Sequence, residues 1–286
     1  MEAYAKISSK HEEGVAKMIP KTIHYCWFGG NPKPELIQKC IASWKEVLPE
    51  YDIVEWNEQN FDISSNPFTK AAYQSKKWAF VSDLARLSII YDYGGIYIDT
   101  DVELSSEPFS EYLSCNAFFY FSNLQYIATG LGFGAKAKDP LVKKLLESYK
   151  NIEFDPQKTN ELACPLLNTP VIKEMIPNLV QNNSTQLIDN YAFISENEYW
   201  KFAKHYGAFS WRSEEQDKAL EYARKNHTAS KFRQMLQNSS LSSFLEKHHL
   251  RKLNKLYIFL VYDLFDYGIR YWLMKVKFKC IGMLRK

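Results

Sequence analysis

One run of residues, Lys77–Asp101, constrains the fold more than any other part of this 286-residue chain. Apolar residues recur at three- and four-residue spacing from Phe80 to Tyr91, which predicts an amphipathic helix over residues 78–93. The pair Gly94-Gly95 can adopt the positive φ that ends a helix. A β-branched and aromatic segment follows, so we expect a short strand at residues 96–98.

This strand leads into two acidic residues, Asp99 and Asp101. If the chain is still extended there, both side chains point the same way and share one small volume. Two carboxylates this close raise each other's pKa unless a cation lies between them, and oxygen ligands suit Mg²⁺ or Mn²⁺. Taken alone, a D-x-D pair favours a solvated turn. Asp83 and Arg86 add to the signal because they share one face of the predicted helix, where an ordinary ion pair is the alternative to a binding role.

The run S-D-x-x-R followed by Y-G-G-I-Y-x-D-x-D resembles the sugar-binding D-x-D region of glycosyltransferase family 32. The resemblance implies a GT-A fold, a nucleotide-sugar donor, a divalent metal such as Mn²⁺ or Mg²⁺, and retention of the anomeric configuration. It also implies roles for the motif residues. Asp101 would hold the metal, Asp99 would bridge the metal and the ribose, and the remaining donor-binding or catalytic positions would be Asp83, Arg86 and Tyr97.

Two other segments match the same family. The opening I-P-K-x-I-H-x-x-W-x-G-G, residues 19–30, predicts a buried first strand, and Trp27 would stack on the nucleotide base if it is not simply a core residue. The segment 205–211 resembles the terminal H-x-x-x-G-S-W element. By that match His205 is the third metal ligand, and the donor phosphates would be contacted by Ser210 and Trp211, although Phe209 stands where a glycine is common.

Weaker assignments come from the middle of the chain. In the resembled family, the region that includes Asn123 and Gln125 borders the acceptor pocket, so these two are candidates for acceptor contact. The triplet Asn168-Thr169-Pro170 occupies the place of the family's small-Gly-Pro element, but its glycine is missing.

The order of elements predicts an α/β fold. A helix over residues 34–47 and a second strand over 51–56 follow the first strand, and this alternation favours a parallel sheet whose carboxyl edge collects ligands. We therefore expect a GT-A-type (Rossmann-like) nucleotide-sugar-binding domain at residues 18–212. A basic helical C-terminal region would follow at residues 213–286.

Composition narrows the function classes. The net charge of +3 gives no support for a general nucleic-acid binder. The five cysteines have no C-x-x-C spacing, which favours reduced thiols in a cytoplasmic protein over a disulfide frame or a zinc site. Residues 1–17 are polar and do not resemble a signal peptide, so we expect them to be an extension before the first strand.

The charge is unevenly distributed. Residues 244–286 contain ten Lys or Arg and three acidic residues, which makes this segment +7 and the rest of the chain −4. Leucines at helical spacing in the same segment are compatible with two interpretations, a helix packed on the catalytic domain or a basic amphipathic helix on an anionic membrane surface. The second is favoured, and it would place the protein at the inner face of the cell membrane.

The family resemblance implies a retaining, metal-dependent glycosyltransferase. It would move a hexose of the galactose or glucose type, from a UDP-linked donor, to a hydroxyl of a lipid-linked glycan in bacterial capsular or surface polysaccharide synthesis. The alternatives are a GDP-mannose-dependent mannosyltransferase, a metal-dependent phosphohydrolase or nucleotidyltransferase, and a sugar-binding module with a vestigial site.

The basic segment generates a first testable prediction. Each Lys or Arg near an anionic surface gains about 1 kcal/mol, so we expect the full chain to sediment with phosphatidylglycerol vesicles and to be released by salt. A chain that ends near Asn238 should stay in the supernatant and still hydrolyse donor. Equal sedimentation with neutral and anionic vesicles would contradict the electrostatic part, and failure of the shortened chain to fold would favour the packed helix.

Overall fold

The computed structural model describes residues 18–121, 126–159, 161–180, 182 and 184–207. Several predictions fall outside these described residues, namely those on the N-terminal extension, on Asn123 and Gln125, on Ser210 and Trp211, and on the basic C-terminal region.

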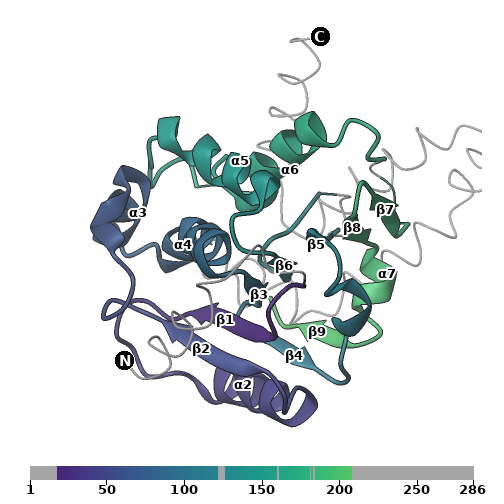
Figure 1. Ribbon diagram of the computed structural model, residues 1–286. Coiled ribbons are helices and arrows are strands. Elements are labelled where there is room, and N and C mark those ends of the chain that lie inside the picture. The colour runs from purple at the N-terminus through teal and green to yellow at the C-terminus, as the bar shows by residue number, and fades with distance from the viewer. Residues whose placement is uncertain (1–17, 122–125, 160, 181, 183, 208–286) are drawn as a thin grey trace, which may run out of the picture. The chain divides into compact units, whose positions relative to one another are not determined.

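A seven-stranded sheet with the order β2-β1-β3-β6-β5-β8-β7 forms the centre of the described fold (Figure 1). Strands β2, β1 and β3 are parallel, as predicted, and β5 is parallel to β8. Strand β6 runs antiparallel to both β3 and β5, and β7 runs antiparallel to β8. The strands are β1 Thr22–Cys26, β2 Asp52–Trp56, β3 Gly95–Tyr97, β5 Ala117–Tyr120, β6 Phe133–Ala135, β7 Gln186–Ile188 and β8 Tyr191–Ile194.

A second, two-stranded sheet pairs β4 (Val102–Leu104) with β9 (Ala203–His205) in antiparallel register. It matters for function because β4 begins directly after the acidic pair and β9 ends at the predicted third metal ligand.

Helices cover both faces of the large sheet. Figure 1 shows α3, α4, α5 and α6 on one side of it and α2 on the other. Among the described helices, none combines the length and the apolar composition needed to cross a bilayer. The helices are α2 Glu35–Val47, α3 Pro67–Gln74, α4 Trp78–Tyr93, α5 Pro140–Ser148, α6 Cys164–Met175 and α7 Glu196–Tyr199, with short 3₁₀ turns η1 Ile63–Ser65, η2 Ser110–Tyr112 and η3 Tyr149–Asn151.

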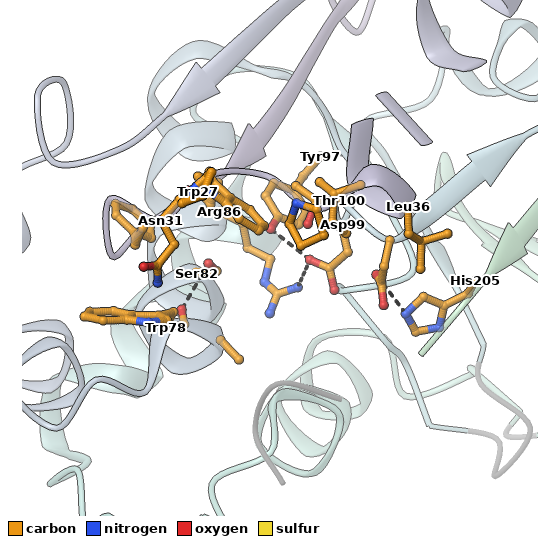
Figure 2. Close-up of a pocket in the computed structure, with 17 residues that line it drawn as sticks. Trp27, Asn31, Leu36, Trp78, Ser82, Arg86, Tyr97, Asp99, Thr100 and His205 are labelled. Carbon is orange, nitrogen blue, oxygen red and sulfur yellow. Dashed lines mark hydrogen bonds and ion pairs between the residues drawn. The ribbon is translucent and has the colours of Figure 1, made fainter. Parts of the chain in front are cut away.

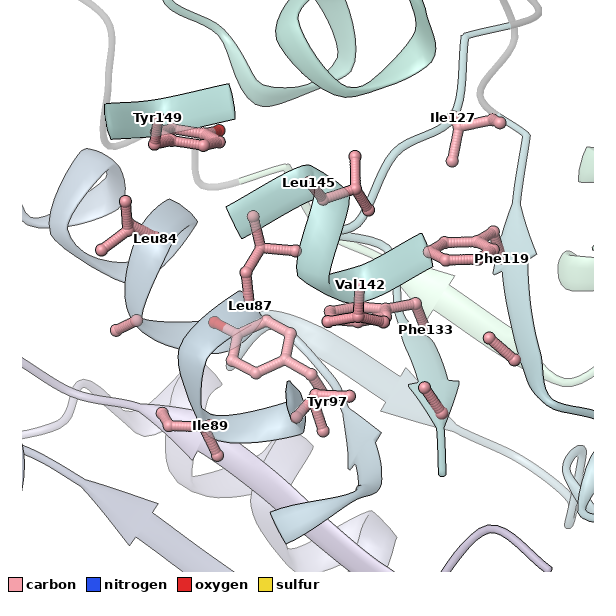
Figure 3. Close-up of a cluster of buried hydrophobic side chains, with 14 of the residues drawn as sticks. Leu84, Leu87, Ile89, Tyr97, Phe119, Ile127, Phe133, Val142, Leu145 and Tyr149 are labelled. Atoms are coloured by element: carbon pink, nitrogen blue, oxygen red, sulfur yellow. The ribbon is translucent and has the colours of Figure 1, made fainter. Parts of the chain in front are cut away.

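The two faces of the sheet carry two separate hydrophobic clusters. The first, shown in part in Figure 3, joins α4, α5 and α6 to the sheet and includes Tyr97 of β3. The second joins α2 to the other face and includes Ile96 of the same strand. Because adjacent residues of β3 are buried in opposite clusters, this strand is apolar throughout, as expected for a central strand of an α/β fold. The predicted α/β class is confirmed.

The transition from α4 to β3 has the predicted form. The helix ends at Tyr93, and Gly94 and Gly95 have φ values of +66° and +99°. A Cβ atom at Gly95 would lie 2.7 Å from the carbonyl oxygen of Thr22 and 2.8 Å from Nε2 of His24. Glycine is therefore required here both for the backbone conformation and for the close approach of β3 to β1.

Asp139 generates a prediction for stability. It caps α5: its Oδ1 accepts hydrogen bonds from the backbone N–H of Leu141 (2.9 Å) and of Val142 (3.0 Å), and its Oδ2 accepts one from the hydroxyl of Tyr191 (3.1 Å). Asp139→Ala should lower the free energy of unfolding by about 2 kcal/mol, because the cap is lost and a buried hydroxyl loses its partner.

Asp139→Asn is the matched control, because its amide oxygen can still accept from the two N–H groups. Urea denaturation of both variants measures the difference. Equal losses for the alanine and asparagine variants would show that capping contributes little at this position.

Candidate active site

The site begins at a buried ion pair on α4. Asp83 and Arg86 are one turn apart and are 6% and 3% exposed, and their side chains form an ion pair. Arg86 also reaches beyond its own helix, since its Nη1 lies 3.3 Å from Oδ1 of Asp99. One guanidinium thus compensates carboxylates from two elements, α4 and the segment after β3.

Asp99 is held in place by its neighbours. Its Oδ1 accepts a hydrogen bond from the Tyr97 hydroxyl at 2.8 Å, in addition to the contact with Arg86. The guanidinium carbon of Arg86 lies 5.1 Å from the centre of the Tyr97 ring, within cation–π range. Burial raises the pKa of Asp99, the Arg86 charge lowers it, and the nearby Asp101 raises it again, so that the net direction is upward.

The acidic pair lies in a turn, and the prediction of an extended chain at Asp99–Asp101 is wrong. The backbone N–H of Val102 donates to the carbonyl of Asp99 at 3.1 Å. The chain turns here because Val102 leaves the large sheet and begins β4, which must pair with β9. The two carboxylates are nevertheless kept close together by this turn.

The β4–β9 pairing brings His205 to the acidic pair. Val102 stands opposite His205 in the ladder, and the N–H of Tyr206 donates to the carbonyl of Asp101 at 2.9 Å. As a result, Nε2 of His205 lies 3.2 Å from Oδ1 of Asp101. Burial lowers the pKa of His205, whereas the hydrogen bond and charge of Asp101 raise it, and the net direction is upward.

The predicted metal ligands are therefore together. One donor atom each from Asp99, Asp101 and His205 lies within 4.8 Å of the others. Two carboxylates and one imidazole form a donor set that suits a divalent ion such as Mn²⁺. Because Asp101 favours the protonated form of His205, a bound ion would have to displace that proton. The residues present fit the metal that the sequence predicted.

A cavity of about 500 Å³ opens beside this cluster (Figure 2). One end is charged and is lined by the acidic pair, His205 and Arg86. The other end is lined by Trp27 and Trp78, which Figure 2 shows on either side of Asn31. Of the predicted residues, Tyr97 also lines the cavity, whereas Asp83 is not among the described residues that line it.

Trp78 was missed in the sequence, although a signal existed. Trp78, Ser82 and Arg86 are spaced four residues apart on α4, and all three line the cavity. A Cβ atom at Gly29 would lie 2.6 Å from the Trp78 indole, so the glycine turn after β1 packs directly on this ring. The same turn holds Trp27, whose indole N–H donates to the carbonyl of Asn31 at 2.7 Å.

The weaker assignment at residues 168–170 is located inside α6. Asn168 and Thr169 are buried, and Pro170 is accommodated within the helix. None of the three is among the described residues that line the cavity.

Two comparisons with known proteins bear on this site. Residues 2–131, which include Asp83, Arg86 and the acidic pair but not His205, match a family described as capsular polysaccharide synthesis protein. The chain is also 32% identical over 91 residues to inositol phosphoceramide mannosyltransferase 3 of Schizosaccharomyces pombe, covering 29% of this chain and 24% of that protein. Each match covers less than half of this chain, and both agree with a resemblance to glycosyltransferase family 32. The family resemblance predicted from the D-x-D region is confirmed.

The chain matches a second curated protein, again only in part. It is 26% identical over 133 residues to subversion of eukaryotic traffic protein A of Legionella pneumophila, covering 37% of this chain and 20% of that protein. The chain thus spans a quarter or less of the length of these curated relatives. The position of the acidic pair after the central strand β3 agrees with the GT-A-type α/β class that the resemblance implied.

Two solved structures are similar to this chain at lower identity. One is a PaToxG glycosyltransferase, with a TM-score of 0.48 and 18% identity over 62% of this chain and 78% of that chain. The other is a glycosyltransferase involved in the glycosylation of the major capsid of PBCV-1, with a TM-score of 0.37 and 12% identity over 65% and 93% of the two chains.

Proposed function

We propose that this protein is a metal-dependent glycosyltransferase that moves a hexosyl group from a nucleotide-sugar to a hydroxyl of a glycan. The observation that carries the proposal is the composition of one cavity. A carboxylate–carboxylate–imidazole cluster and a buried arginine line one end of it, and two indole rings line the other. A diphosphate donor has the same division, with an anionic centre flanked by a planar base and a polyhydroxylated sugar.

The indole end suits the nucleotide base. Trp27 and Trp78 offer two aromatic faces, and each is fixed, Trp27 by its hydrogen bond to the Asn31 carbonyl and Trp78 by its contact with the Gly29 turn. Aromatic faces that are already ordered bind a planar ring without a large loss of side-chain entropy. This supports Trp27 as the base-stacking residue and adds Trp78 to it.

The charged end suits the diphosphate and the sugar. Asp99, Asp101 and His205 would hold the divalent ion, which neutralises the charge that develops on the departing diphosphate. Arg86 is the residue best placed for the sugar, because it lines the cavity and its planar fork is oriented by Asp83 and Asp99. Asp83 would act through Arg86, since the described cavity lining does not include it.

Two donors are considered. The sequence favoured a UDP-linked hexose of the galactose or glucose type, transferred with retention to a lipid-linked acceptor in capsule or surface polysaccharide synthesis, and the family match to capsular polysaccharide synthesis proteins supports this pathway. The relative named as a mannosyltransferase supports GDP-mannose as the second candidate. The basic C-terminal segment supports peripheral attachment to an anionic membrane.

A donor screen tests the proposal directly. Purified protein is incubated with UDP-glucose, UDP-galactose and GDP-mannose in the presence and absence of Mn²⁺. We expect Mn²⁺-dependent release of a nucleoside diphosphate from one of them. Release of nucleoside monophosphate or free phosphate would instead indicate a phosphohydrolase or nucleotidyltransferase, and no Mn²⁺-dependent product from any donor would contradict the proposal.

Asp101→Asn tests the metal assignment. Losing one anionic ligand should weaken Mn²⁺ binding and abolish turnover while the fold is retained, because Asp101 lies in a turn at the cavity and not in the core. Calorimetric titration with Mn²⁺ and a thermal melt measure the two effects. Wild-type turnover at saturating donor would rule out Asp101 as a metal ligand.

Arg86→Lys tests the sugar contact. The positive charge is kept, but a point charge cannot contact Asp83, Asp99 and a sugar oxygen in the way a planar fork does. We expect kcat/KM for donor hydrolysis to fall about ten-fold or more, or roughly 1.4 kcal/mol in transition-state terms. Unchanged kinetics would reduce the ion pairs of Arg86 to a structural role.

A further inference from the structure

The segment Ile127–Leu131 belongs to the region that the family resemblance places beside the acceptor pocket, and its Gly130 packs against Asp99 and Arg86 of the site. The carbonyl of Gly130 accepts a hydrogen bond from the backbone N–H of Asp99 at 3.3 Å. A Cβ atom at Gly130 would lie 2.6 Å from Oδ2 of Asp99 and 3.0 Å from Nη1 of Arg86. Gly130 does not have a positive φ, so the backbone conformation does not demand glycine. Glycine is needed for a steric reason, because a side chain at position 130 would collide with Asp99 and Arg86, the groups proposed to face the ion and the sugar.

The position of Gly130 matters because it faces one particular oxygen of Asp99. Oδ1 is occupied by the Tyr97 hydroxyl and by Arg86. Oδ2 is the oxygen left for a ligand, and it is the one that a side chain at position 130 would displace. Since Tyr97 and Arg86 hold Oδ1, the carboxylate cannot rotate away without breaking one of those two contacts.

Helix α6 fixes this wall from behind. Thr169 accepts a hydrogen bond from the N–H of Ile127 at 2.9 Å, and the amide of Asn168 donates to the Thr129 hydroxyl at 3.1 Å. Cys164, at the start of the same helix, accepts a hydrogen bond from Nη2 of Arg86 with an N–S distance of 3.8 Å. These three residues of α6 are all buried, at 8%, 0% and 2% exposure for Cys164, Asn168 and Thr169. One buried polar face therefore holds both Arg86 and the segment that carries Gly130.

We propose that Gly130, held by Asn168 and Thr169 of α6, is a positioning residue that sets the orientation of the Asp99 carboxylate and of Arg86 toward the ion and the donor sugar. This inference rests on the proposed function, since Gly130, Asn168 and Thr169 would act only by holding Asp99 and Arg86 of the same site. It also gives the triplet Asn168-Thr169-Pro170 a role that does not require contact with a ligand.

Gly130→Ala and Gly132→Ala form the first matched pair. Gly132 is two residues away with φ +146°, and a Cβ atom there would meet its nearest neighbours at 3.4 Å or more, so alanine strains the same segment without reaching Asp99. Binding of Mn²⁺ alone is measured by loss of the free-ion EPR signal, and folding by thermal melting. Gly130→Ala should weaken Mn²⁺ binding about ten-fold or more, the size of effect seen when groups that orient metal ligands are removed. Gly132→Ala should lower the melting temperature and leave Mn²⁺ affinity unchanged.

Thr169→Val and Thr169→Ser form a second pair in case Gly130→Ala does not fold. Valine removes the hydroxyl that holds Ile127, and serine keeps it. We expect the valine variant to bind Mn²⁺ more weakly and to lose kcat for donor hydrolysis with little change in KM, and the serine variant to recover both.

The outcomes separate the two proposals. If the wild type binds no Mn²⁺, the proposed function fails and this inference fails with it. If the wild type binds Mn²⁺ but Gly130→Ala, or Thr169→Val where the first variant is unfolded, binds it equally well, the positioning role is overturned and the proposed function stands.

Discussion

The site depends on one buried guanidinium. Arg86 is nearly inaccessible to solvent, and a charge in that position must be compensated by partners from the chain. Asp83 compensates it within α4, and Asp99 compensates it from the end of β3. Removing one partner of such a buried set leaves an uncompensated charge that costs about 3–5 kcal/mol. The middle of α4 and the end of β3 are therefore held together by electrostatics as well as by packing. The orientation of Asp99 toward the cavity follows from this requirement.

The position of His205, the proposed third metal ligand, depends on a different interaction, the two-stranded pairing of β4 with β9. Helix α2, which lies on the opposite face of the large sheet from α4, fixes β4. The Trp44 indole donates to the Val102 carbonyl at 2.7 Å, and the Ser43 hydroxyl accepts from the N–H of Leu104 at 3.0 Å. Strand β9 then places His205 opposite Val102. The acidic pair lies in the turn that connects the large sheet to the small one, and the histidine lies on the small sheet, so the geometry of the proposed metal site is set where the two sheets meet.

Local sequence signals predicted the parts of the fold that depend on local interactions. Helix periodicity and the Gly94-Gly95 pair gave α4 its observed bounds, Trp78–Tyr93, because side-chain spacing and positive φ are properties of neighbouring residues. The turn at Asp99 could not be predicted, because it follows from pairing with β9 far along the chain. For the same reason the place of β6 between β3 and β5 was not foreseen, whereas the antiparallel β7–β8 pair has a local cause in the positive φ values of Asp189 and Asn190. His205 came from the family resemblance alone, since no spacing rule connects it to Asp101.

The arrangement of the strands explains how one cavity can have an aromatic end and a charged end. Strands β1 and β3 are parallel neighbours, so their carboxyl ends open on the same edge of the sheet. The aromatic end combines Trp27, which follows β1, with Trp78 of α4, and the acidic pair follows β3. Helix α4 precedes β3 and carries Trp78 at its start and Arg86 two turns later, so it connects the two ends. Under the proposed function, the base and the charged groups would contact different strand ends, so a substitution after β1 would change base preference without altering the groups around Asp99. The glycine turn after β1 would then be the place where nucleotide specificity varies while the proposed metal ligands stay the same.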